Sequence, residues 1–220
     1  MPRVELAAIA PEIVLSAAAL VILLVDAFIG ERMKDKWYLA VLSTIGLGVA
    51  IYTTRFAWEL REAPELQLSS MAAADGFAVF AKVALAAFGL LTVWLSRDYL
   101  SRHDLEESEF YALVLFATAG MMLMATAADL ILMFVALETF SIALYVLVGF
   151  RRRSLESQES AMKYFLLGAF SSAFFLFGIA LVYGAVGSTN LYTGIIEFVN
   201  TNPTSEGGLL VLGVGFLIVG

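Results

Sequence analysis

Cysteine is absent from this sequence of 220 residues, and histidine occurs once, as His103. Without cysteine the chain can form no disulfide, hold no iron–sulfur cluster through thiolates and offer no thiol nucleophile. A single histidine argues against metal or haem sites that need several imidazoles. We therefore expect the chain to bind no cofactor and no metal, so that any redox centre would belong to a partner.

Charged residues are also scarce. They make up 15% of the chain, whereas 61% of its residues are hydrophobic and the mean hydropathy is +0.88. A soluble domain is nearer half apolar and a quarter charged. One aqueous core cannot bury such an excess, which indicates a membrane protein. The net charge of −7 comes mostly from acids in loops and argues against nucleic-acid binding. P-loop, dinucleotide-binding and nucleophile-elbow motifs are missing as well.

Six stretches are long and apolar enough to cross about 30 Å of hydrocarbon, which takes about 20 residues of helix. They cover residues 8–29, 37–57, 76–96, 109–127, 130–150 and 161–184, and a seventh apolar run begins at Gly207. A short amphipathic piece near 191–199 precedes that run. The sequence thus predicts an all-α polytopic membrane protein with six complete transmembrane helices and a truncated seventh.

The seventh run, GGLLVLGVGFLIVG, provides fourteen residues, or about 21 Å of helix. A helix that stopped there would leave its last carbonyls without partners in lipid. From this we expect the 220 residues to be a fragment of a longer protein, whose continuation completes the seventh helix.

Lysine and arginine are distributed unevenly between the two ends of the spans. The connections after the first, third and fifth spans carry eight of them, and the N-terminus and the other connections carry Arg3, Arg55 and Arg61. Because cytoplasmic loops are enriched in these residues, we expect the N-terminus to lie outside. The first span is predicted to be a permanent anchor, since its positive charges follow the apolar run rather than precede it.

Glu138 is the first of three ionisable candidates inside the predicted spans. It lies near the midplane of LILMFVALETFSIALYVLVGF, and Ser141 and Tyr145 share its helical stripe. A charge at this depth costs about 2.5–3.5 kcal/mol on insertion scales. Glu138 could be a protonated carboxyl that bonds a neighbouring helix, or a group that titrates on a proton pathway. Because intramembrane acids are functional by default, the second interpretation is favoured.

Two lysines are the other candidates. Lys163 follows Glu156 and Glu159 on one face of the sixth span. It could form a simple i,i+4 pair with Glu159 and snorkel to the interface, or receive protons that the two acids gather. The spacing does not separate these alternatives. Lys82 lies seven residues inside the third span, where it could snorkel outward, pair with Asp75 or carry protons.

A family resemblance is carried by FYALVLFATAGMMLMATAADLILMFVALETFSIALYVLVGF and SLESQESAMKYFLLGAFSSAFFLFGIALVYGAVGSTNL. These segments resemble the antiporter-like membrane subunits of respiratory complex I, and among them the subunit N family of NADH-quinone oxidoreductase. The pattern LE-x-x-S-x-x-LYVLV is typical of that family. APEIVLSAAALVILLVDAF and DGFAVFAKV are similar to it more loosely.

The resemblance implies a fold of fourteen helices, of which this chain would be the N-terminal part. Residues 1–104 would form the first three helices, and residues 105–220 would begin the antiporter-like proton-channel repeat. Glu138 matches the family's buried glutamate of the fifth helix, which tunes the proton affinity of a lysine across the channel. Lys163 matches the sixth-helix lysine. Lys82 lies outside the channel-forming helices and gains little, and the family's seventh-helix lysine would lie beyond Gly220.

The resemblance also implies a function. The chain would be a proton-translocating subunit of NADH:quinone oxidoreductase in a bacterial plasma membrane, surrounded by lipid and by other membrane subunits of complex I. Quinone reduction in partner subunits, which would hold the flavin, the iron–sulfur clusters and the quinone site, would drive the protons. Two alternatives are an Mrp-like cation/proton antiporter subunit and a membrane scaffold that pumps nothing.

Overall fold

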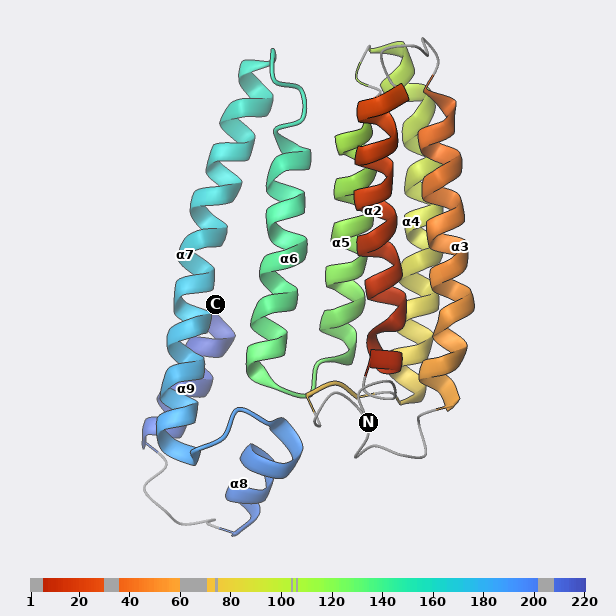
Figure 1. Cartoon of the computed structure of the whole chain (residues 1–220). Coiled ribbons are helices and arrows are strands. Elements are labelled where there is room, and N and C mark those ends of the chain that lie inside the picture. The colour runs from red at the N-terminus through yellow and green to blue at the C-terminus, as the bar shows by residue number, and fades with distance from the viewer. Residues whose placement is uncertain are drawn as a thin grey trace.

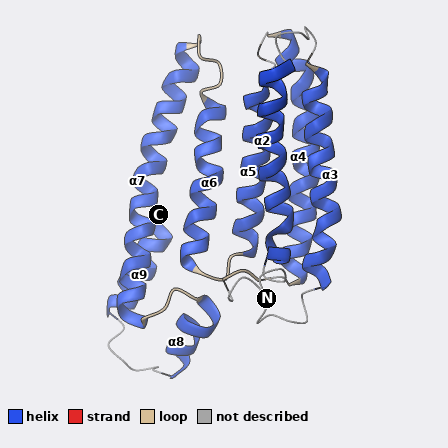
Figure 2. Ribbon diagram, viewed as in Figure 1, coloured by secondary structure: helices blue, strands red, loops and turns tan. Residues whose placement is uncertain are grey.

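The computed structural model describes residues 6–29, 36–59, 71–73, 75–103, 105, 107–201 and 208–220. This part of the chain is almost wholly helical (Figures 1 and 2). The long helices are α2 (Ala10–Ile29), α3 (Trp37–Glu59), α4 (Gly76–Arg102), α5 (Ser108–Thr126), α6 (Leu130–Val148) and α7 (Leu155–Val186). The short ones are η1 (Leu6–Ile9), the π-helix η6 (Leu191–Ile196), α8 (Glu197–Thr201) and α9 (Gly208–Val219).

Among the described residues, the six helices α2 to α7 are long and apolar enough to cross a membrane. They leave large apolar side chains on the outside, such as Phe80 (71% exposed), Leu95 (77%) and Phe170 (66%). Exposed apolar side chains in such number are unfavourable in water but suit contact with acyl chains. The prediction of six transmembrane helices is confirmed, and the chain is a multi-pass membrane protein.

Two helices extend beyond the predicted spans. α4 continues to Arg102 instead of ending near 96, and α7 begins at Leu155 instead of 161. Both extensions carry charged side chains, so they do not count as apolar length, yet their backbone stays helical. The start of α7 is capped by the Ser154 side chain, which accepts a hydrogen bond from Ser157 N at 3.3 Å.

The helices form a four-helix bundle with a smaller group beside it. α2, α3, α4 and α5 lie side by side, α6 and α7 stand next to them, and α9 packs against α7 (Figure 1). The larger buried core fills the bundle and includes Leu15, Leu47, Val93 and Leu115. A smaller core joins α6 and α7 through Leu130, Phe175, Ile179 and Val182. The predicted division into 1–104 and 105–220 is not tested by the fold and stays a prediction. In the structure, the larger core contains residues of α5 together with residues of α2, α3 and α4.

Three connecting segments are hydrogen bonded to one another at one end of the helices. The α5–α6 connection lies between residues 71–73, which precede α4, and residues 189–191, which follow α7. Ala73 N donates to Thr126 O at 2.7 Å and Leu191 N to Ala128 O at 2.9 Å. These bonds hold the start of α6 between both halves of the described chain.

Asp129 strengthens the same junction. Its Oδ1 accepts a hydrogen bond from Ile131 N at 2.8 Å, which caps α6, and its Oδ2 accepts one from the Thr189 hydroxyl at 2.7 Å. The side chain is buried. The helix that carries Glu138 is therefore anchored at its first turn.

α5 and α6 approach each other closely at Gly120. A Cβ atom there would lie 2.7 Å from Phe140 N and 3.2 Å from Ala136 O, so no side chain fits. We expect Gly120→Leu to push the helices apart and to lower stability by about 1–3 kcal/mol or more, as overpacking does. Thermal unfolding in detergent would measure the loss. Gly48→Leu is a matched control, because a Cβ at Gly48 meets nothing within 4 Å; equal losses in both variants would contradict the prediction.

Candidate functional site

Glu138 lies in the middle of α6, with eight helical residues before it and ten after it. Its Oε1 atom is buried and has no hydrogen-bond partner among the described residues. An ionised oxygen in such surroundings is unfavourable unless a proton or a partner group satisfies it. No described residue supplies such a partner for Oε1 of Glu138.

The side of α6 that carries Glu138 faces away from α5. Ala136 and Phe140 lie against Gly120 of α5. Each is two residues from Glu138, which is about 200° around the helix at 100° per residue. Glu138 thus points to the opposite side, toward the helices that follow α6.

Tyr145 lies on the same predicted stripe of α6 as Glu138. Its contacts show which helix this side of α6 faces. Its hydroxyl lies where a Cβ of Gly168 in α7 would be. Its ring makes edge contacts with Tyr164 and Phe165, with centroids 5.0 and 5.7 Å apart. The polar stripe of α6 therefore faces α7, the helix of the second candidate.

Lys163 lies on the outside of α7. Its side chain is 74% exposed, and its Nζ is 2.5 Å from Oε1 of Glu159, which is 66% exposed. The i,i+4 ion pair that the spacing allowed is therefore formed.

The described chain does not bring Glu138 and Lys163 together. α6 and α7 run antiparallel, and a Cβ at Gly149 would lie 2.9 Å from Cβ of Ala161. Lys163 is thus level with the last turn of α6. Glu138 is about nine residues, or about 14 Å, further along the axis. Any coupling between the two must pass through other groups.

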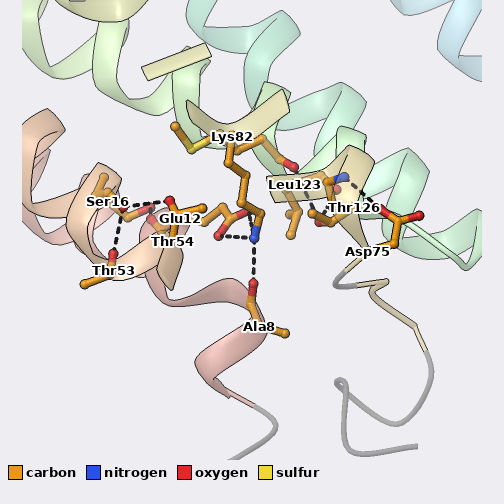
Figure 3. Close-up of polar contacts among 12 residues, drawn as sticks. Ala8, Glu12, Ser16, Thr53, Thr54, Asp75, Lys82, Leu123 and Thr126 are labelled. Atoms are coloured by element: carbon orange, nitrogen blue, oxygen red, sulfur yellow. Dashed lines mark hydrogen bonds and ion pairs between the residues drawn. The ribbon is translucent and has the colours of Figure 1, made fainter. Parts of the chain in front are cut away.

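Lys82 is the lysine that the structure buries. It is 1% exposed, and its Nζ lies 2.9 Å from Oε1 and 3.2 Å from Oε2 of Glu12. It also donates a hydrogen bond to the carbonyl of Ala8 at 2.6 Å (Figure 3). The side chain of Glu12 is 7% exposed. α2 and α4 are therefore joined by an ion pair inside the bundle.

Lys82 neither snorkels outward nor pairs with Asp75, which were two of the alternatives that its position in the span left open. Asp75 caps α4, accepting a hydrogen bond from Ala78 N at 2.7 Å, and lies apart from the ammonium group in Figure 3. The sequence candidates also miss Glu12. The sequence does contain a clue to this pair, because Glu12 and Lys82 are opposite charges in two apolar spans. Either charge is unfavourable in the membrane unless it meets the other.

A second charge cluster ties α2, α3 and α5 together at the opposite end of the bundle. Lys36 Nζ lies 2.5 Å from Glu107 Oε2 and 3.6 Å from Asp26 Oδ2, and the Tyr38 hydroxyl donates to Asp26 at 2.5 Å. Burial by itself would lower the pKa of Lys36, but the hydrogen bond and charge of Glu107, with those of Asp26, outweigh it and raise that pKa. Lys36 is thus held charged at the helix ends.

No cluster of three or more His, Cys, Asp or Glu suited to a metal ion occurs in the part of the chain that the structure describes. The polar features with a bearing on chemistry are therefore the acid of α6, the exposed pair on α7 and the buried pair between α2 and α4.

Comparisons with known proteins show which families the chain resembles. The family model described as NADH:quinone oxidoreductase/Mrp antiporter, TM, matches residues 127–220. NADH-quinone oxidoreductase subunit N of Trichlorobacter lovleyi is 40% identical over 99% of this chain and 43% of its own length. Subunit N of Chloroflexus aggregans is 41% identical over 87% of this chain and 38% of its own length. The chain thus spans less than half the length of these curated relatives.

Solved structures give the same result for the fold. A chain of respiratory complex I from Thermus thermophilus matches with a TM-score of 0.70 and 33% identity, over 94% of this chain and 42% of that one. A chain of an archaeal membrane-bound sulfane sulfur reductase matches with a TM-score of 0.71; at 19% identity it shows the fold alone. In sequence and in fold the chain is therefore similar to a membrane subunit of complex I. The predicted resemblance to the subunit N family of NADH-quinone oxidoreductase is confirmed.

Proposed function

We propose that this chain is part of a proton-translocating membrane subunit of NADH:quinone oxidoreductase. The observation that carries the proposal is Glu138, an acid at the centre of a transmembrane helix whose Oε1 is buried without a partner among the described residues. Acids so placed commonly serve proton relays. The relatives named as subunit N of this enzyme support the same function.

In this proposal Glu138 alternates between a charged and a neutral form as neighbouring groups approach and withdraw. An opposite charge within about 4–6 Å favours the carboxylate, whereas an apolar environment favours the protonated acid. Lys163 would exchange protons with the cytoplasm through its exposed pair with Glu159. Lys82, held by Glu12 and Ala8, would stabilise the bundle instead.

No electron would pass through this chain. The flavin, the iron–sulfur clusters and the quinone site would lie in partner subunits, and quinone reduction there would supply the driving force. The subunit would lie in a bacterial plasma membrane with its N-terminus outside, in contact with lipid and with other membrane subunits of the complex. The distribution of lysine and arginine supports this orientation.

We expect Lys163→Gln to lower proton pumping while leaving thermal stability nearly unchanged. An exposed i,i+4 pair contributes only about 0.3–0.5 kcal/mol, and both partners are exposed in this protein. Lys163→Arg keeps the positive charge but cannot exchange a proton, because arginine stays protonated. This variant should also pump poorly. The measurement is the initial rate of proton uptake by sealed vesicles, together with the unfolding midpoint. Normal pumping by both variants would remove Lys163 from the pathway.

The whole proposal is tested by purifying the intact protein from its native membrane under mild conditions. We expect it to co-purify with flavin and iron–sulfur subunits, and NADH oxidation with quinone to acidify one side of sealed vesicles. Sodium or lithium sensitivity after deletion, with normal NADH:quinone turnover, would favour the Mrp-like antiporter. Unchanged pumping after neutralisation of Glu138 would favour the scaffold.

A further inference from the structure

A cavity of about 850 Å³ lies at the ends of α4, α5 and α6, remote from Glu138. Its wall includes Arg151, Arg152 and Arg153, the three consecutive arginines between α6 and α7. We call it the arginine pocket. Because these residues lie just beyond the last turn of α6, the pocket lies at the level where the helices leave the membrane.

The three arginines are not neutralised by the described residues. No carboxylate of that part of the chain forms an ion pair with any of them. Two acids lie in the described part of the wall. Glu107 is paired with Lys36 at 2.5 Å, which leaves Glu109. His103 also lines the pocket. Among the described residues of its wall, the pocket therefore holds an excess of positive charge, which suits an anion.

An apolar groove of about 230 Å³ begins where the arginine pocket ends. The two hollows share Glu109, Phe150 and Arg152. From there the groove follows a single stripe of α5, through Ala112, Leu113 and Phe116, with Leu23 of α2 and Val146 of α6 on its sides. Phe116 is eight residues into α5, so the groove reaches about 12 Å along the helix.

We propose that the arginine pocket and this groove together bind one anionic phospholipid of the surrounding leaflet. The phosphate would lie among the arginines, whose planar guanidinium groups donate paired hydrogen bonds to phosphate oxygens. An acyl chain would lie in the groove between α5 and α6. Basic pockets between transmembrane helices at the membrane surface bind lipid head groups of this kind.

The two hollows favour a lipid over other anions. A soluble phosphate would need the arginines but not the groove, and an acidic protein segment would not need an apolar path into the hydrocarbon layer. Only a lipid joins an anionic group to an apolar chain at this depth. A lipid bound there would lie along the interface between the four-helix bundle and α6, the helix that carries Glu138.

The test uses the intact protein in its native assembly, placed in nanodiscs of phosphatidylcholine. A small amount of phosphatidylglycerol with a photoreactive diazirine in its acyl chain is added, and the labelled peptides are mapped by mass spectrometry. We expect labelling of the peptides that contain Leu113 and Val146. Unlabelled phosphatidylglycerol should compete several-fold better than phosphatidylcholine.

Two kinds of variant test the two halves of the site. Arg151→Gln with Arg153→Gln should lower the labelling several-fold, whereas Arg97→Gln with Arg102→Gln, in the same charged layer but outside the pocket, should not. Val146→Trp should lower it by filling the groove, without changing any charge that directs membrane insertion. Labelling that survives both changes would overturn the proposal. Three other results would also overturn it: equal competition by phosphatidylcholine, competition by inorganic phosphate, and crosslinking of this face to a protein subunit.

Discussion

Lys82→Ala is expected to cause a large loss of folded protein, larger than that caused by Gly120→Leu. Lys82 is 1% exposed and joined to Glu12 inside the bundle of α2 to α5. Removing one partner leaves the other charge buried and unpaired, which costs about 3–5 kcal/mol in proteins. Because total stability is commonly only about 5–15 kcal/mol, the variant should accumulate poorly and unfold at a much lower temperature.

A double variant separates the charge from the packing. Lys82→Met keeps most of the side-chain volume but leaves the charge of Glu12 without a partner. Lys82→Met combined with Glu12→Gln removes both charges. We expect the double variant to recover most of the stability lost by the single one, since neutral replacements avoid the unpaired charge. Fluorescence-detected size exclusion after heating would rank the variants. Lys163→Ala, the exposed counterpart, serves as the control; a Lys82→Ala protein as stable as that control would refute the assignment.

Glu138→Gln is expected to abolish most proton pumping without harming assembly. The acid has a buried oxygen with no partner among the described residues. A neutral amide keeps the shape of this side chain but removes the group that would take up and release a proton. Loss of a proton-transfer group typically lowers a rate by about 10²–10⁴-fold, so we expect pumping to fall by about 10²-fold or more. Glu138→Asp should keep part of the activity, since the charge remains but lies about one methylene away.

This second prediction is measured as the initial rate of proton uptake in sealed vesicles, together with coupled NADH:quinone turnover. Ser141→Ala is a matched control on the same stripe of α6, because it removes a polar group that does not titrate. The amount of assembled complex is determined for each variant. Pumping at the normal rate by the assembled Glu138→Gln protein would exclude Glu138 from the proton path.

The architecture of this protein was predictable from its sequence because the bilayer imposes it. A span needs about 20 apolar residues, and every backbone group within it must be bonded internally. Apolar length alone therefore located all six transmembrane helices, and the placement of Glu138 at the centre of α6 followed directly. The errors lie at Arg102 and Leu155, where charged turns continue a helix that hydropathy cannot detect.

Tertiary structure alone decided which charges meet. Lys82 and Glu12 are seventy residues apart in the chain, and no helical period links them; only the packing of the four-helix bundle makes them partners. Packing likewise turned Glu138 toward α7, left Lys163 at the surface and joined three arginines to an apolar groove. Composition and periodicity determine which residues enter the membrane, because transfer from water acts on each residue separately. The pairing of polar groups depends on helix contacts, because electrostatic interactions depend on distances that the order of residues does not contain.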